Sequence, residues 1–259
     1  MKSFVKKWLG DPEPAGERSI PRVEAGHRIY SIGDIHGRFD LLQELHRMIA
    51  EDAANFEGGK TLVYLGDYID RGLWSREVID DLLESPLNGF ESVYLLGNHE
   101  QTLLDFLEQP KIAAGWLSWG GRETLVSYGV DLPLNISREK LAAIRDEFEG
   151  RLPVEHLEFF RNMQLMHVSG DYLFVHAGIR PGKPIQEQSN ADLLWIREDF
   201  TESRMQHDFV VVHGHTISEE VVFRPNRIGI DTGAYATGVL TCLVLEGEER
   251  RLLQTGGEQ

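Results

Sequence analysis

The chain has 259 residues, of which 26 are basic and 42 acidic, and its formal net charge is −16. Hydrophobic residues make up 41% and charged residues 26%, which is ordinary for a globular protein and excludes disordered and fibrous chains. The acidic charge disfavours nucleic acid as a partner, because a phosphate backbone attracts Lys and Arg and repels carboxylates.

The cysteine content and the N-terminus bear on the compartment. The one cysteine, Cys242, cannot form an internal disulfide, so the sequence favours a reducing, cytoplasmic environment. No stretch approaches the ~20 apolar residues that span a bilayer, and no apolar run of a secretory signal follows the N-terminal lysines. Residues 1–26 are predicted to be a solvated N-terminal extension; the alternative is a short basic amphipathic helix that lies on a membrane or a partner.

Strand and helix patterns alternate in the first hundred residues. Short apolar runs predict three buried strands, at residues 28–32, 61–65 and 92–96. Helical spacing of apolar side chains predicts a helix over residues 39–53, and Ser75 is the expected N-cap of a second helix. The order β-α-β-α-β implies parallel strands joined by right-handed crossovers.

The rest of the chain divides into a helical part and a strand-rich part. Residues 101–164 are predicted to form a mostly helical insertion, with one helix around residues 141–148 and another that has Pro153 in its first turn. Further apolar runs predict strands at residues 172–176, 209–213, 228–230 and 239–246. We expect these strands to form a second sheet packed on the first. Residues 27–259 are therefore predicted to be one domain.

Polar residues with metal-ligand chemistry follow several of these strands. The carboxyl ends of parallel strands share one edge of a sheet, so these residues are expected to converge. The candidates are Asp34, His36, Asp67, Asn98, His176 and His215. His213 and His215 would share a face of extended chain, so either is a candidate ligand, and the pattern Gly-His-Thr favours His215.

This residue set is typical of a site for divalent transition metals. Carboxylate, imidazole and amide oxygen are suitable ligands, and a hydrolase also needs an open position for water. Two cations ~3.5–4 Å apart, bridged by one carboxylate, can generate a hydroxide at neutral pH and hold a phosphoryl group. Asp67 is the central candidate for the bridge. Each motif alone is a weak signal, but all of them in order, each after its own strand, are specific.

The motifs resemble those of the phosphoprotein phosphatase branch of the calcineurin-like metallophosphoesterases, in particular its bacterial members. They are Gly-Asp-Ile-His-Gly (33–37), Gly-Asp-Tyr-Ile-Asp-Arg-Gly (66–72), Gly-Asn-His-Glu (97–100), His-Ala-Gly (176–178) and Gly-His-Thr (214–216). The resemblance implies an α/β fold, an αββα sandwich of two mixed β-sheets flanked by helices, with a dinuclear metal site at the sheet edges. Residues 27–259 would be its catalytic domain.

The resemblance also assigns roles to single residues. It gives one metal ion the ligands Asp34, His36 and Asp67, and the other the ligands Asp67, Asn98, His176 and His215. His99 would be the general acid, and Asp70 would orient it and keep it protonated. Arg71 would bind the phosphate, and Arg197 stands where bacterial relatives place a second phosphate-binding arginine. Mn²⁺ is the expected ion, with Fe or Zn as alternatives.

The implied function is that of a serine/threonine-type or dual-specificity protein phosphatase. Its substrates would be phosphoserine, phosphothreonine or phosphotyrosine in proteins or peptides, attacked in line by a hydroxide that bridges the two metals. The alternative is a symmetrical bis(5'-nucleosyl)-tetraphosphatase, which hydrolyses diadenosine tetraphosphate. Asp70 and Glu100 favour protein substrates, because the nucleotide-cleaving relatives tend to carry alanine and aspartate there. A non-catalytic module on the same fold is disfavoured, because every ligand type is present.

The chain departs from the family pattern at Leu96, where many relatives carry an arginine. Arg122 and Arg180 are the candidates to supply the missing contact. Three tryptophans either form the wall of a substrate groove or pack in the core: Trp116, Trp119 and Trp195.

Overall fold

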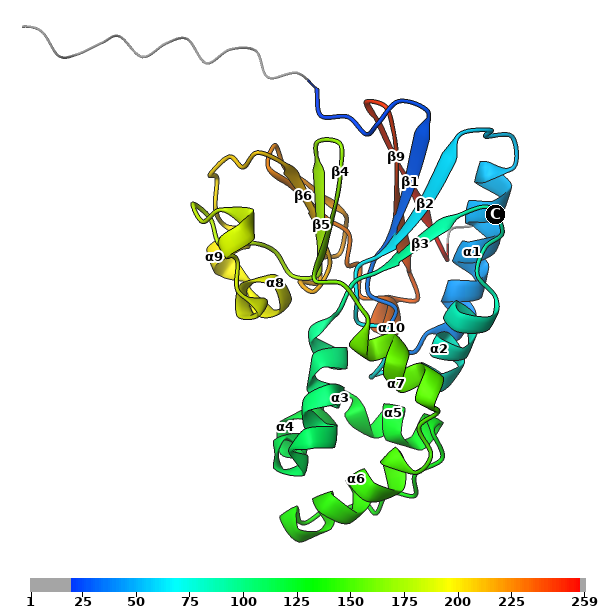
Figure 1. Cartoon of the computed structure of the whole chain (residues 1–259), viewed down its shortest axis with the longest axis vertical. Coiled ribbons are helices and arrows are strands. Elements are labelled where there is room, and N and C mark those ends of the chain that lie inside the picture. Colours follow the sequence, from blue (N-terminus) through cyan, green and yellow to red (C-terminus); the bar gives the residue numbers. More distant parts are fainter. Residues whose placement is uncertain (1–19, 257–259) are drawn as a thin grey trace, which may run out of the picture.

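The computed structural model describes residues 20–256, and the part of the predicted N-terminal extension at residues 1–19 lies outside them. Two five-stranded sheets pack face to face, and helices cover both outer faces (Figure 1). This architecture is the αββα sandwich that the sequence predicts. Within residues 20–256, every helix is too short or too polar to cross a bilayer.

The first sheet has the strand order β10-β9-β1-β2-β3. Its strands are β1 (His27–Ile32), β2 (Gly59–Tyr64), β3 (Glu91–Tyr94), β9 (Thr241–Glu246) and β10 (Glu249–Gln254). Strands β1, β2 and β3 are parallel, as their β-α-β-α-β order predicts. The outer face carries α1 (Phe39–Ala53), whose bounds match the prediction, and α2 (Ser75–Glu84).

The second sheet has the order β4-β5-β6-β8-β7. Its strands are β4 (Met166–Ser169), β5 (Tyr172–Val175), β6 (Val210–His213), β7 (Val222–Phe223) and β8 (Arg227–Gly229). Three short helices lie in the connections of this sheet. They are α8 (Asn190–Trp195) and α9 (Glu198–Thr201), between β5 and β6, and α10 (Ala234–Thr237), after β8. Of these, α8 and α9 lie against the outer face of the second sheet (Figure 1).

The prediction that residues 239–246 belong to the second sheet is wrong. Strand β9 pairs antiparallel with β1 in the first sheet, with Tyr30 opposite Val244. Its apolar pattern indicates burial on both faces, but such a pattern does not specify the neighbouring strand. The pairing leaves β10, which carries the charged residues Arg250 and Arg251, at the edge of the sheet.

The helices that connect β3 of the first sheet to β4 of the second lie below the first sheet in Figure 1. They are α3 (Asn98–Glu108), α4 (Ala113–Trp116), α5 (Gly121–Ser127), α6 (Leu141–Glu149) and α7 (Val154–Arg161). Short 3-10 turns occur at η1 (Pro110–Ile112), η2 (Leu117–Trp119), η3 (Arg138–Lys140) and, after β5, η4 (Ile185–Glu187). Helical structure thus starts before residue 101, directly after β3.

Two predicted helix starts need correction. Ser75 is the first residue of α2 rather than its cap, and its hydroxyl accepts the backbone N–H of Asp70 at 3.0 Å. Pro153 lies in the cap position before α7. Proline has no backbone N–H, and at a helix start this costs no hydrogen bond within the helix. In both cases the residue type correctly indicates where the helix starts, but its position relative to the first helical residue differs by one from the prediction.

Alternating side chains divide the core into layers. In β1, Ile29 packs between the two sheets, whereas Tyr30 and Ile32 pack against the helices on the outer face. In β9, Leu243 and Leu245 face the second sheet in the same way. Successive residues of a strand point to opposite faces, so one buried strand serves both layers. The packing fixes the two sheets relative to each other and brings their strand ends together.

Candidate metal centre

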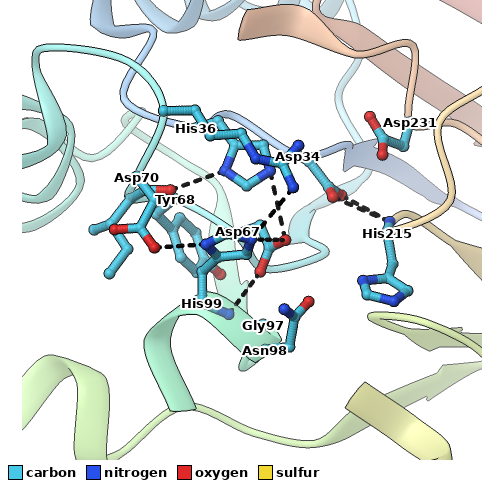
Figure 2. A network of polar contacts seen from close by, with 12 residues as sticks. Asp34, His36, Asp67, Tyr68, Asp70, Gly97, Asn98, His99, His215 and Asp231 are labelled. Atoms are coloured by element: carbon cyan, nitrogen blue, oxygen red, sulfur yellow. Dashed lines mark hydrogen bonds and ion pairs between the residues drawn. The ribbon is translucent and has the colours of Figure 1, made fainter. Parts of the chain in front are cut away.

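The candidate site lies where strand ends from both sheets meet (Figure 2). Strands β1, β2 and β3 lead into the first three polar motifs, and β5 and β6 of the second sheet lead into the other two. All ten predicted site residues lie at this edge or line the cavity beside it. They are Asp34, His36, Asp67, Asp70, Arg71, Asn98, His99, His176, Arg197 and His215.

Glycines permit this close approach of neighbouring loops. Gly66 has φ +104°, and a Cβ there would lie 2.7 Å from the Cα of Gly97. A Cβ on Gly214 would lie 2.0 Å from Oδ1 of Asp34. No other residue type fits at such distances, so packing requires glycine at both positions.

The backbone of the site is held in a costly conformation. Within residues 20–256, the non-glycine residues with positive φ all belong to the predicted site: His36, Asp67, Asp70, Arg71 and His215, with φ between 47° and 73°. Left-handed backbone is unfavourable for such residues and persists only where the surrounding structure imposes it. This concentration of strain is typical of functional sites.

Asp67 lies at the centre of the cluster (Figure 2). Its Oδ2 lies 3.5 Å from Nε2 of His36 and 3.8 Å from Nε2 of His99, and its Oδ1 lies 3.4 Å from Nε2 of His176. Two groups of buried donors share this carboxylate: His36, Asp67 and His99, and Asp67, His176 and His215. Within each group the donor atoms lie within 4.8 Å of one another. One carboxylate facing two donor groups is suited to bridge two cations.

The histidines are held in the form that binds metal. Nδ1 of His36 donates to the carbonyl of Ile69 at 2.9 Å, and Nδ1 of His176 donates to the carbonyl of Leu65 at 2.8 Å. Both bonds leave Nε2 directed into the cluster. Burial lowers the pKa of His36 to about 3 and that of His215 to about 2, so both rings are neutral at pH 7.

The geometry distinguishes between His213 and His215. His215 joins Asp67 and His176 in one donor group. The Nε2 atoms of His213 and His215 are both buried without a hydrogen-bond partner among the described residues, so that feature does not separate the two. His213 lies outside both donor groups and packs edge-on against Phe200 with ring centres 5.1 Å apart. A buried nitrogen close to two other donors fits a metal ligand, so the donor grouping favours His215, as the Gly-His-Thr pattern does.

Excess negative charge also fits a cation site. Asp34 accepts the backbone N–H of His215 with both carboxylate oxygens, at 3.0 and 3.2 Å. Burial, together with the charges of Asp231 and Asp67, raises the pKa of Asp34 well above its usual range. Burial likewise raises the pKa of Asp231 to about 6. Three buried carboxylates repel one another, and a bound divalent cation would relieve that repulsion.

His99 and Asp70 form a buried pair beside the cluster. Nδ1 of His99 lies 2.5 Å from Oδ2 of Asp70. Burial lowers the pKa of His99, but the carboxylates of Asp67 and Asp70 outweigh this effect and raise it to about 9. Asp70 in turn accepts from Nε1 of Trp116 at 2.7 Å and from Oγ1 of Thr124 at 2.5 Å. The imidazole therefore carries a proton at neutral pH, as a general acid must.

A cavity of about 780 Å³ opens beside this pair. His99 and three arginines, Arg71, Arg122 and Arg197, line it. Nη2 of Arg71 lies 3.4 Å from Nε2 of His99, so one phosphate oxygen could contact both. The Arg71 guanidinium also stacks on the ring of Tyr235, 4.6 Å from its centre.

The alternatives for the missing arginine are now distinguishable. Arg122 lines the cavity, and its Nη2 donates to the carbonyl of Pro133 at 3.1 Å. Arg180 instead pairs with Asp192 at 2.7 Å and Asp199 at 2.8 Å, and it does not line the cavity. Of these two arginines, Arg122 is therefore the one placed to contact a bound phosphate.

The three tryptophans divide between the two expected roles. Trp119 and Trp195 line the cavity and are 49% and 40% exposed. Trp116 is fully buried, and its indole contacts Asp70 rather than the cavity.

Sequence reasoning missed three residues of the site. Asp231 follows β8 with the same apolar-then-acidic pattern as the earlier motifs, which could have identified it. Tyr235, the partner of Arg71, carries no such signal. Glu100 was expected only to discriminate between substrates, but its buried carboxylate accepts backbone N–H groups of the loop after β2 and of Gly97, at 2.8 to 3.2 Å. Glu100 thereby holds the loop that carries Asp67.

Curated relatives resemble the chain over most of its length. It is 27% identical over 233 residues to bis(5'-nucleosyl)-tetraphosphatase PrpE [asymmetrical] of Anoxybacillus flavithermus, covering 82% of this chain and 88% of that protein. The protein of the same name from Halalkalibacterium halodurans is 26% identical, covering 82% and 87%.

Solved structures support the fold. One, provisionally described as a diadenosine tetraphosphatase, has a TM-score of 0.60 at 21% identity, covering 89% of this chain and 95% of that one. A cold-active protein tyrosine phosphatase has a TM-score of 0.55 at 18% identity, covering 97% and 89%. Residues 27–237 match the family model of the calcineurin-like phosphoesterases. The chain therefore belongs to the calcineurin-like phosphoesterase family.

Proposed function

We propose that this phosphoesterase hydrolyses dinucleoside polyphosphates, with diadenosine tetraphosphate as the model substrate. The observation that carries the proposal is the presence of three arginines, Arg71, Arg122 and Arg197, around one cavity in a chain of net charge −16. A single phosphoryl group needs one or two guanidinium partners, whereas a polyphosphate chain presents several charged groups in a row. The names of the curated relatives are consistent with this substrate class.

The proposed metal ligands are Asp34, His36 and Asp67 for one cation, and Asp67, Asn98, His176 and His215 for the other. Two donor groups that share Asp67 support this proposal. The first of them contains His99 beside His36 and Asp67, and the carboxylate of Asp34 accepts the backbone N–H of His215. When bound, two divalent cations, proposed to be Mn²⁺ with Fe or Zn as alternatives, would lower the pKa of water and neutralise phosphate charge.

The side chains around the cluster would bind and orient the phosphate. Arg71 and Arg197 would hold the oxygens of the scissile group, and the stack on Tyr235 limits the motion of the Arg71 guanidinium. His99 would give its proton to the leaving oxygen from Nε2, because Asp70 occupies Nδ1. Asp70 would keep the ring oriented and charged.

Phosphoserine, phosphothreonine and phosphotyrosine in proteins or peptides are the second candidate substrates. The pair of His99 and Asp70 favours them, because an alkoxide leaving group depends strongly on a proton donor. A phosphate leaving group, as in a dinucleotide, is less basic and depends on it less.

The test compares the two classes directly. The full chain would be stripped of metal, reloaded with Mn²⁺, and assayed for kcat/KM on diadenosine tetraphosphate and on the three phosphopeptides. The expected result is faster cleavage of the dinucleotide, with a nucleoside triphosphate and a monophosphate as products of an asymmetrical cut. Two diphosphates would instead mark the symmetrical activity, and faster hydrolysis of the peptides would make the protein a phosphatase.

A further inference from the structure

Two exposed tryptophans meet at the rim of the cavity. Trp119 lies in η2, and Trp195 is the last residue of α8, so the two come from opposite halves of the molecule. Their ring centres lie 6.1 Å apart at an angle of 62°. With exposed fractions of 49% and 40%, both indoles present apolar surface to solvent that burial would stabilise.

The pair is directly connected to the reaction site. The ring of Trp195 lies edge-on to that of His215, with centres 6.4 Å apart. On the other side, Trp119 shares the cavity lining with Arg122. A ligand anchored on the indoles would therefore share the cavity with the arginines and lie beside the proposed metal cluster.

This combination of groups matches a nucleotide better than phosphoserine or phosphothreonine. Any nucleobase can stack on an indole face, and guanidinium groups can bind the phosphates of the same nucleotide. The side chains of phosphoserine and phosphothreonine have no ring to stack. Because the indoles meet edge-to-face rather than in parallel, they leave room for one base on an open face, not for a base between them.

We infer that Trp119 and Trp195 form the stacking platform for one base of the dinucleotide, and that Arg122 contacts the phosphate chain between this base and the scissile group. The inference rests on the proposed function and adds the residues that select the substrate class. It predicts that only one of the two bases is recognised strongly, because the described residues place one such indole pair on this cavity.

The experiment compares substrates with and without a base in the Mn²⁺-loaded enzyme. In Trp119→Ala and Trp195→Ala, kcat/KM for diadenosine tetraphosphate should fall at least tenfold more than kcat/KM for inorganic tripolyphosphate, mainly through KM. Trp119→Phe and Trp195→Phe should retain most of the affinity, because a ring remains. Phe223→Ala removes an exposed aromatic residue, 41% exposed, that does not line the cavity, and it should leave both values unchanged.

A direct binding measurement separates this inference from the proposed function. Titration of the Mn²⁺-loaded wild type and of both alanine variants with adenosine monophosphate should show binding that weakens at least tenfold in the variants. If the wild type binds the nucleotide in this way but does not cleave diadenosine tetraphosphate, the proposed function fails and the platform stands. An equal loss on both substrates, or a larger loss on a phosphotyrosine peptide, would overturn the platform.

Discussion

Trp116 donates its indole N–H to Oδ2 of Asp70, the same oxygen that contacts His99. The indole is fully buried and comes from α4, whereas Asp70 lies in the loop after β2. Thr124 binds the other oxygen of the carboxylate. The helical insertion therefore holds Asp70, and through it the ring of His99, with two hydrogen bonds that no strand end supplies.

Trp116→Phe should lower kcat roughly tenfold and leave KM nearly unchanged, since it removes the donor but keeps most of the buried ring. Steady-state kinetics on the Mn²⁺-loaded enzyme would measure both constants. The matched control is Trp74→Phe, because Trp74 is 43% exposed and does not line the cavity. A variant with unchanged kcat would show that Asp70 does not need this bond.

His99→Asn should retain bound metal and lower turnover by about a hundredfold or more, because it removes the proposed proton donor. Metal content by elemental analysis and kcat on a phosphate ester would be measured together. His167→Asn, at a partly buried position in β4, is the control. Near-normal turnover in His99→Asn would remove His99 from the mechanism.

Asp67→Asn should lose metal and activity together, because the proposed sites for both cations share this carboxylate. Asparagine tolerates the left-handed backbone of position 67, where φ is 53°, so the fold should persist. Titration with Mn²⁺ would count the bound ions, and circular dichroism would confirm folding. Two fully occupied sites in the variant would place the bridge elsewhere.

Asp192 provides a pH-dependent test of stability outside the metal cluster. It completes the capping box of α8, in which Ser189 is the N-cap and donates its hydroxyl to the Asp192 carboxylate, and it pairs with Arg180 at 2.7 Å. Burial opposes ionisation, but the bonds from Ser189 and Arg180 outweigh it and lower the pKa of Asp192 to about 2, from a usual value near 3.8. Its contribution to stability is therefore present above the unfolded pKa and is lost as the pH falls toward 2.

Asp192→Asn should thus cost about 1 kcal/mol of unfolding free energy at pH 7, and the difference from wild type should shrink between pH 4 and pH 2. Urea unfolding at several pH values would measure it, with the exposed Asp131→Asn as control. A difference that stays constant as the solution is acidified would show that the ionised carboxylate is not what stabilises the helix.

Much of the candidate site could be predicted because each strand end has a recognisable local sequence pattern. Asp34, Asp67 and Asn98 each follow an apolar run and a glycine, and the parallel order of the strands determines that they share an edge. The αββα sandwich was implied by the family resemblance of the motifs, and the apolar runs predicted a second sheet packed on the first. These signals depend on neighbours in sequence, so they are readable from the chain.

Contacts between segments that are distant in the chain have no such local sequence pattern. The pairing of β9 with β1 depends on which sheet edge is free, and periodicity does not encode that choice. The bond from Trp116 to Asp70 joins residues 46 positions apart, and the exposed indoles of Trp119 and Trp195 meet only after both halves have packed. The substrate class that we propose depends on such contacts, whereas the class that the sequence favoured was based on single motif residues.

The short stretch from Trp116 to Trp119 has an evolutionary consequence. Its first residue donates a hydrogen bond to Asp70, the partner of the proposed proton donor, and its last forms part of the cavity wall. Insertions, deletions or exchanges here would alter the choice of substrate and the speed of catalysis in the same event. An engineered enzyme in which this stretch is replaced to change the substrate should therefore keep a tryptophan at position 116, so that its hydrogen bond to Asp70 is retained.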